Sequence, residues 1–140
     1  MNNTKHTSSQ QSISQRLIEH GITPTQQRLE IARFLFKTQQ HVSADQILSS
    51  INQAQTPVSK ATVYNTLGLF AQKGLLREVI IDPGKVFYDT NTNHHHHFYN
   101  TSDSTLSDIA HNDLAISDLP NLPGGTEIQS VDVIIKVRNS

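Results

Sequence analysis

The sequence of 140 residues contains no cysteine. Without thiols the chain has no disulfides, no thiolate metal sites and no cysteine nucleophile, and its eight histidines are its only soft ligands. It also lacks an apolar run of about 18 residues, the length that would predict a transmembrane helix. The polar residues 1–11 lack the apolar centre of a secretory signal. These absences predict a cytoplasmic protein with no membrane partner.

The length allows one domain or two small ones and excludes a large enzyme fold such as an α/β barrel. The formal net charge of −1 is unevenly distributed. Residues 1–82 carry eight basic and five acidic side chains, or +3, whereas residues 83–140 carry three and seven, or −4. Such a split favours different partners for the two halves, and chance segregation explains it equally well.

Four amphipathic helices are predicted in the first half, after a tail at residues 1–11 that is expected to be disordered. The first begins at Ile13 and ends where Gly21 can form a left-handed C-cap. The second is expected to begin at Thr23, an N-cap whose capping box is completed by Gln26.

The remaining two helices have clear start signals. A capping box from Ser43 to Gln46 opens the third, and Ser59 caps the fourth. The fourth is expected to run to about Lys73, with Gly74 as its stop signal.

A hairpin follows the helices. Two β-like runs, 75–81 and 86–88, flank the turn signal Asp82-Pro83-Gly84-Lys85. Helices followed by a small hairpin are the layout of a winged helix-turn-helix. We therefore expect a winged-helix DNA-binding domain at 12–89 and a Thr/Asn-rich hinge at 90–93.

The last part, residues 94–140, is predicted to be a small α/β dimerisation and sensing domain, which makes the whole fold α+β. Strands are expected at 98–100 and 106–109, and a helical or irregular stretch at 113–119. Residues 127–137 are the most β-branched of the chain and are predicted to form a buried strand. About 45 residues do not build a self-sufficient core, so we expect homodimerisation here.

The fourth helix has a face suited to DNA. Three apolar residues, Val63, Leu67 and Phe70, are expected to point inward. The opposite face offers a cation for phosphate, a small residue, an aromatic for a thymine methyl and an amide for base edges: Lys60, Ala61, Tyr64, Asn65 and Gly68. Any amphipathic helix exposes a mixed polar face, so composition leaves both interpretations open.

Four consecutive histidines follow the hinge. In an extended segment His95 and His97 share one face, and His94 and His96 share the other. Each face alone supplies two imidazoles, which is half a metal site. The run is internal and follows a hairpin, which disfavours a purification tag.

Several motifs together resemble the ferric uptake regulator family. The resemblance extends from about Gln15 to Arg138 and is carried by Gly21-Ile22-Thr23, Gln27-Arg28, His41 to Asp45, Ala61 to Leu67, and Gly74-Leu75-Leu76 with the wing and histidines after it. Within the family the chain is most similar to the iron response regulators of the Irr type. The features concerned are Tyr64 to Leu67, Asp89-Thr90-Asn91, the absent cysteines and the shortened end from Pro123 to Arg138.

The resemblance implies a homodimer that reads an AT-rich pseudo-palindromic operator with its fourth helix. The DNA-binding residues it implies are Arg28, Lys60, Ala61, Thr62, Tyr64 and Asn65. Many relatives have arginine after the tyrosine, so Asn65 departs from the pattern. Arg28 fits a backbone contact and a buried structural role equally well.

The resemblance also implies a regulatory metal site made of His41, Asp89, His95, His97 and Asp108. Three nitrogens and two carboxylates without sulfur suit Fe(II), Mn(II) or Zn(II) rather than Cu(I). Tyr88 precedes Asp89, and in relatives with a longer gap the ligand position would fall on the tyrosine.

Two family features are missing or altered. The structural Cys₄ zinc site is absent. A second histidine–carboxylate site would use His94 and His96, but its distant histidine falls at Val131, for which His111 is a possible substitute. Irr-type relatives bind haem through this cluster, which implies haem or a secondary metal at His94, His95, His96, His97 and His111.

The sequence thus predicts a regulator, not an enzyme, that controls iron and haem homeostasis genes. A ligand at the His/Asp site between the domains would control DNA affinity. The alternatives are a peroxide- or manganese-type sensor of the same family, a metal-buffering protein, and a non-haem Fe(II) oxygenase, for which the chain has too few strands.

Overall fold

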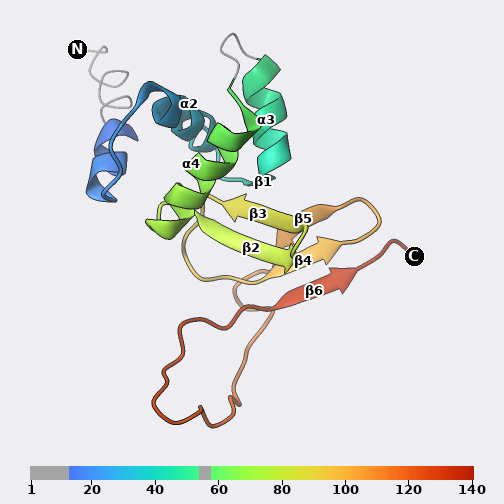
Figure 1. Cartoon of the computed structure of the whole chain (residues 1–140). Coiled ribbons are helices and arrows are strands. Elements are labelled where there is room, and N and C mark those ends of the chain that lie inside the picture. Colours follow the sequence, from blue (N-terminus) through green and yellow to red (C-terminus); the bar gives the residue numbers. More distant parts are fainter. Residues whose placement is uncertain (1–12, 54–57) are drawn as a thin grey trace, which may run out of the picture. The chain divides into compact units, whose positions relative to one another are not determined.

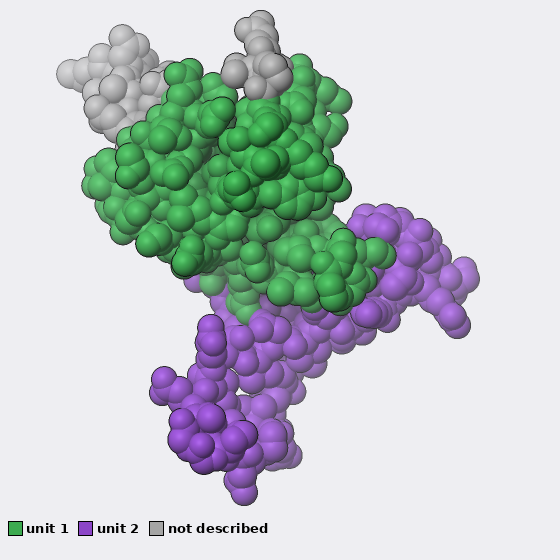
Figure 2. All heavy atoms as spheres, in the orientation of Figure 1, with its two compact units in different colours: residues 1–92 green, residues 93–140 purple. Residues whose placement is uncertain are grey.

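The computed structural model describes residues 13–53 and 58–140. The chain divides into two compact units, residues 1–92 and 93–140, which Figure 2 shows in different colours. The first unit combines helices with a three-stranded sheet, and the second contains another three-stranded sheet with irregular chain (Figure 1). The predicted α+β class is confirmed. The tail predicted at 1–11 lies outside the described residues.

Two helices begin at the predicted caps. Helix α3 spans Ala44–Gln53, and its capping box is formed in both directions: Ser43 N donates to Gln46 Oε1 at 2.9 Å, and Gln46 N donates to Ser43 Oγ at 3.2 Å. Helix α4 spans Lys60–Gln72, and the Ser59 hydroxyl accepts a backbone N–H of its first turn at 3.1 Å. These local signals specify the starts of both helices.

The first two helices agree with the prediction except at one cap. Residues 13–19 are helical, and Gly21 follows with φ of +74°. Helix α2 spans Gln26–Leu35, but its N-cap is Thr25, so the predicted N-cap at Thr23 is wrong. Both threonines are good caps. Thr25 takes the role because its own backbone is extended (φ −106°, ψ 163°) and its hydroxyl accepts a first-turn N–H at 3.3 Å.

The sheet of the first unit has the order β1-β3-β2, and all its pairs are antiparallel. Strands β2 (Arg77–Asp82) and β3 (Lys85–Asp89) form the predicted hairpin around the turn at Pro83 and Gly84. Strand β1 (His41–Ser43) was not predicted, because three residues are too few to show an alternating pattern. It carries the chain directly into α3 (Figure 1).

The core of the first unit lies between the helices and one face of this sheet. Helix α3 contacts α2, α4, β1 and β3. The three residues of α4 expected to point inward are fully buried, and they share one apolar cluster with residues of the other helices and of β3: Leu17, Ile31, Leu35, Ile47, Val63, Leu67, Phe70 and Tyr88. The face of α4 that bears Tyr64 is thereby left outside the core.

The second unit has a sheet of order β5-β4-β6. Strands β4 (His97–Asn100) and β5 (Thr105–Asp108) pair in antiparallel fashion, and β6 (Ile134–Val137) pairs with β4 in parallel. Residues 113–119 are irregular rather than helical.

The predicted strand at 127–137 is wrong in its extent, and within a single chain its large apolar side chains are not buried. Only its last four residues form a strand, and Ile128, Ile135 and Val137 are exposed. High β propensity reflects how well a side chain fits a half-buried pleated surface. In the described part of the chain β6 pairs along one edge only, with β4. In the part of the chain that the structure describes, no helix is both long and apolar enough to cross a membrane.

The Ser59 cap provides a stability test. Replacing Ser59 with alanine removes the acceptor at the start of α4 and should lower the free energy of unfolding by about 1 kcal/mol. Ser59→Asp keeps an acceptor and should stay near the parent value. Urea denaturation followed by circular dichroism measures both, and equal losses in the two variants would contradict this role of the hydroxyl.

Candidate metal-ligand groups and DNA-reading helix

Three side chains form a row across the sheet of the first unit. The strand registers pair His41 with Asp89 and Asp89 with Arg77, so the three lie on one face. The ligand atoms of His41 and Asp89 lie within 4.8 Å of each other. Asp89 is only 1% exposed, and its Oδ1 accepts the Asn91 backbone N–H at 2.9 Å. The row therefore combines an imidazole, a buried carboxylate and a guanidinium.

The residue before Asp89 points to the other face of β3. Tyr88 belongs to the apolar cluster on the helix side. Burial, followed by the negative charge of Glu78, raises the pKa of Tyr88 above its usual value. The phenol therefore stays neutral at neutral pH and is a poor metal ligand. Alternation along β3 thus presents Asp89, and not Tyr88, on the His41 face.

A small hydrogen-bond network holds the ends of the two ligand-bearing strands. Gln40 N donates to Thr90 Oγ1, and Thr90 N donates to Gln40 O, each at 3.1 Å. The Gln40 side-chain amide donates to Phe34 O at 3.2 Å and to Leu35 O at 2.9 Å. These are terminal carbonyls of α2, which have no partner inside the helix. The residues that flank His41 and Asp89 are thereby tied to the end of α2.

A second ligand group lies within the C-terminal unit. The register of β4 and β5 places His97 opposite Asp108. Asp108 Oδ1 lies 3.2 Å from His95 Nε2 and 3.4 Å from His97 Nε2, and the two rings are 4.4 Å apart. His97 is 3% exposed, whereas Asp108 is at the surface. Two imidazoles and one carboxylate therefore converge on one point.

The tautomer of His95 makes this point suitable for a cation. His95 Nδ1 lies 2.6 Å from Asn93 O, and because a carbonyl only accepts, Nδ1 carries the proton. In the neutral ring Nε2 is then a lone-pair atom, and it faces the oxygen of Asp108. A metal ion placed beside both atoms would therefore meet two lone-pair donors.

The other two histidines of the run make backbone contacts. His94 Nε2 donates to Val131 O at 2.6 Å, and His96 Nδ1 accepts the Val133 N–H at 3.1 Å. A neutral His96 with its Nδ1 lone pair in use has only a donor N–H left. The two rings thus hydrogen-bond the backbone of residues 131–133, the segment that leads into β6. His111 is exposed in the turn after β5.

The predicted DNA face is exposed along α4. Lys60, Ala61, Tyr64 and Asn65 are all at the surface. The Tyr64 hydroxyl donates to Asp45 Oδ1 at 3.0 Å, and Lys60 Nζ lies 5.5 Å from the Tyr64 ring centroid. A cation, an aromatic ring and an amide therefore share this surface.

The other two predicted DNA residues have intramolecular partners. Arg28 is half-buried on α2, and its Nη1 donates to Thr23 O at 2.9 Å. Thr62 is half-buried, and its hydroxyl lies 2.9 Å from Ser59 Oγ. Of the two roles left open for Arg28, the structural contact is therefore present.

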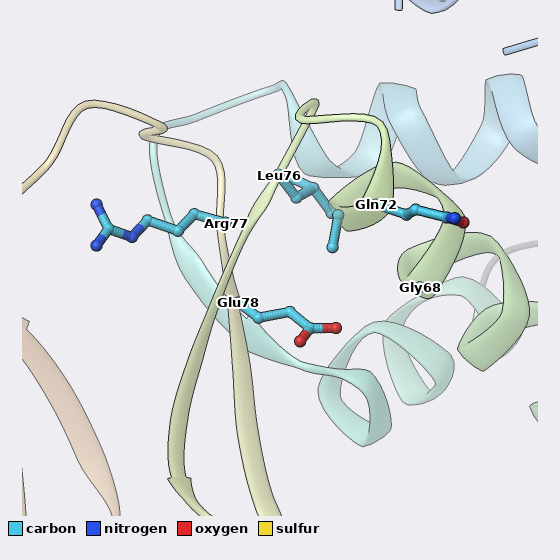
Figure 3. Close-up of a pocket in the computed structure, with 6 residues that line it drawn as sticks. Gly68, Gln72, Leu76, Arg77 and Glu78 are labelled. Carbon is cyan, nitrogen blue, oxygen red and sulfur yellow. The ribbon is translucent and has the colours of Figure 1, made fainter. Parts of the chain in front are cut away.

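A pocket of about 390 Å³ lies between α4 and β2, and Figure 3 shows its walls. It is lined by Gly68, Ala71, Gln72, Leu76, Arg77 and Glu78. The Glu78 carboxylate points toward α4, whereas Arg77 extends away from the helix (Figure 3). The pocket therefore lies on the side of β2 that faces α4, opposite the side on which His41 and Asp89 lie.

Sequence reasoning missed three residues around these sites: Gln40, Asp45 and Arg77. Asp45 and Tyr64 are 19 positions apart, and no local pattern links them. Arg77 is adjacent to Asp89 only through the register of the hairpin, which contains an irregularity between Ile80 and Asp82. The only sequence feature that could have pointed to Gln40 is that it directly precedes the predicted ligand His41.

Comparison with known proteins agrees with this arrangement. The sequence pattern of the ferric uptake regulator family matches residues 19–135. A peroxide-responsive repressor, PerR, of Staphylococcus aureus (strain Mu50) is 33% identical over 81 residues, 58% of this chain and 55% of its own length. PerR of Staphylococcus epidermidis is 32% identical over 77 residues, 55% and 51% of the two chains. The chain thus matches about half the length of these curated relatives.

Solved structures share the fold at lower identity. The ferric uptake regulator of Pseudomonas aeruginosa with manganese has a TM-score of 0.67 at 20% identity and covers 91% of this chain and 97% of its own. That of Francisella tularensis with iron has a TM-score of 0.68 at 22% identity, with coverages of 85% and 92%.

The family consists of transcriptional regulators rather than enzymes, so the oxygenase alternative is set aside. With a family match over most of its length and the same two-sheet α+β fold, this chain belongs to the ferric uptake regulator family.

Proposed function

We propose that the protein is a homodimeric, metal-responsive DNA-binding transcription regulator of iron and haem homeostasis, acting in the cytoplasm. The observation that carries the proposal is a pair of incomplete ligand groups, one in each unit of the chain. The first contains His41 and Asp89, and the second contains His95, His97 and Asp108. Both consist of nitrogen and oxygen donors only.

Neither group alone fills the coordination shell of a divalent cation. The first offers two side chains and the second three, whereas such ions take about four to six donors. We infer that one Fe(II) or Mn(II) ion recruits both groups, with Zn(II) as a competitor in vitro. An ion that binds the linked arrangement more tightly than the unlinked one shifts the population toward it, and the position of the DNA-reading heads changes with it.

Helix α4 is the proposed reader of the major groove. Lys60 near its start would contact phosphate, Ala61 would allow close approach, Tyr64 would pack on a thymine methyl, and Asn65 would contact base edges. Thr62 and Arg28 would support this surface through the contacts they make within the chain. Two heads of a dimer would match an AT-rich pseudo-palindromic operator.

The C-terminal unit is the proposed dimer interface. This unit has 48 residues and no cysteine, so neither a disulfide nor a thiolate zinc site stabilises it. It exposes a series of large apolar side chains: Ile116, Leu119, Leu122, Ile128, Ile135 and Val137. An apolar surface of this kind on a small unit is stabilised by burial against a second copy.

The physiological signal has two candidate types. The absence of cysteine and the Asp89-Thr90-Asn91 segment support an Irr-type iron regulator. The names of the staphylococcal relatives support a peroxide sensor as the alternative. Haem is the second candidate ligand, and His94 is its candidate axial residue because the His94 ring is half-exposed. Its Nε2 carries the proton that is donated to Val131 O, so Nδ1 of the neutral ring has a free electron pair for iron.

The first-carboxylate position can be tested with a matched pair of variants. Asp89→Asn keeps an oxygen for the Asn91 N–H but removes the charge, and it should weaken Mn(II) binding at least about 10-fold, because even residues that only support ligands act on that scale. Tyr88→Phe keeps the core ring and should leave the affinity unchanged. Isothermal titration of the whole chain measures both, and the reverse result would move the ligand to Tyr88.

The regulator function can be tested with a library of AT-rich palindromes and the purified chain, without ligand and with Fe(II), Mn(II) or haem. Tyr64→Ala should weaken specific binding and leave metal uptake intact. His97→Ala should weaken the ligand's effect on DNA binding, and the exposed Asp108→Asn should do the same with less risk to folding. Failure to select any sequence in every ligand state would refute the proposal.

The dimer interface can be tested with a charge on β6. Ile135→Glu should convert the protein to a monomer in analytical ultracentrifugation, because an unpaired carboxylate would be buried in the interface. Ile80→Glu is the control, since Ile80 is an exposed isoleucine of the first unit. A monomeric parent protein, or a dimeric Ile135→Glu variant, would contradict the proposed interface.

A further inference from the structure

The exposed tyrosine of α4 is held at both its tip and its ring. Its hydroxyl donates to Asp45 Oδ1 on α3 at 3.0 Å, although the residue remains 40% exposed. The Nζ of Lys60, one turn earlier on α4, is 5.5 Å from the ring centroid, within the range of a cation–π contact. Tyr64 is therefore a surface side chain with a defined orientation.

Asp45 is itself fixed by the start of α3. It lies in the first turn, where the helix dipole stabilises a carboxylate, and the Ser43–Gln46 capping box determines the path of that turn. The hydrogen bond to Asp45, then partial burial and the charge of Asp45, raise the pKa of Tyr64 above its usual value. The hydroxyl therefore remains a donor throughout the neutral range.

We propose that Asp45 is a positioning residue for DNA recognition, which holds the Tyr64 ring in the single orientation that meets the base edges. The inference rests on the proposed function, because it requires α4 to read DNA. A helical tyrosine without this partner would spread over about two χ1 wells, because the third clashes with the preceding turn of the helix. A ring needed in one of them is then correctly placed about half of the time. Affinity falls in proportion, about 2-fold for one head and about 4-fold for two.

Asp45 is also expected to affect DNA affinity in a way that does not depend on the DNA sequence. Its negative charge lies beside the surface that would approach phosphates, and it lowers the affinity for every duplex alike. Its role in recognition is therefore measured by the ratio of specific to non-specific affinity, and not by either affinity alone.

Two substitutions at this position separate the charge from the hydrogen bond. Asp45→Asn and Asp45→Ala remove the same charge, but only asparagine retains an oxygen that can accept from Tyr64. Each is titrated, as the whole chain saturated with Mn(II), against a duplex selected by the parent protein and against a scrambled duplex of equal composition at one salt concentration. Both variants should bind the scrambled duplex more tightly and to the same degree. The affinity ratio should fall about 4-fold in Asp45→Ala and stay near the parent value in Asp45→Asn.

A double-mutant cycle with Tyr64→Phe distinguishes positioning from a structural role. Tyr64→Phe should reduce the ratio as much as Asp45→Ala, and the double variant should lose no more than either single one. Additive losses, accompanied by a lower melting temperature in Asp45→Ala, would overturn the inference in favour of helix stabilisation. An unchanged or higher ratio in Asp45→Ala would overturn it as well.

The two proposals fail differently in this experiment. If Tyr64→Ala loses specificity while Asp45→Ala does not, only the role of Asp45 is refuted. If Tyr64→Ala leaves the ratio unchanged, α4 is not the reader, and the proposed function and the inference both fail.

Discussion

Strand β3 determines the positions of the functional residues of the first unit, because it is paired along both edges. Its alternation sends Tyr88 into the helix-side core and Asp89 to the opposite face. Its pairing with β1 places His41 beside Asp89, and the Gln40–Thr90 hydrogen bonds close the end of this ladder. A shift of one residue in β3 would exchange the buried phenol of Tyr88 and the candidate ligand carboxylate of Asp89.

The other neighbour of Asp89 is decided by a single irregularity in the hairpin. A regular ladder continued from the turn would place Glu78 opposite Asp89, so that two carboxylates would repel each other. The shift between Ile80 and Asp82 pairs Arg77 with Asp89 instead and turns Glu78 toward α4. This bulge therefore gives the ligand face a positive neighbour, and it was not visible in the sequence because a bulge has no strict sequence signature.

The histidine run shows how far local patterns reach. Alternation predicted that its odd- and even-numbered members would face opposite ways, and the two pairs do make separate contacts. It did not predict what each pair would meet: Asp108 arrives through the register of β5, and the backbone of residues 131–133 through the parallel pairing of β6. The strand predicted at 127–137 was too long for the same reason, because propensity does not say which residues meet a partner strand.

The sequence by itself determined the caps at Ser43 and Ser59, the inward face of α4 and the hairpin turn, since each depends on residues only a few positions apart. Tertiary structure decided that Asp45 meets Tyr64 across 19 positions and that Gln40 meets Thr90 across 50. Contacts of that separation arise from the packing of whole helices and strands, and the order and register of those elements are not encoded in any local segment of the chain.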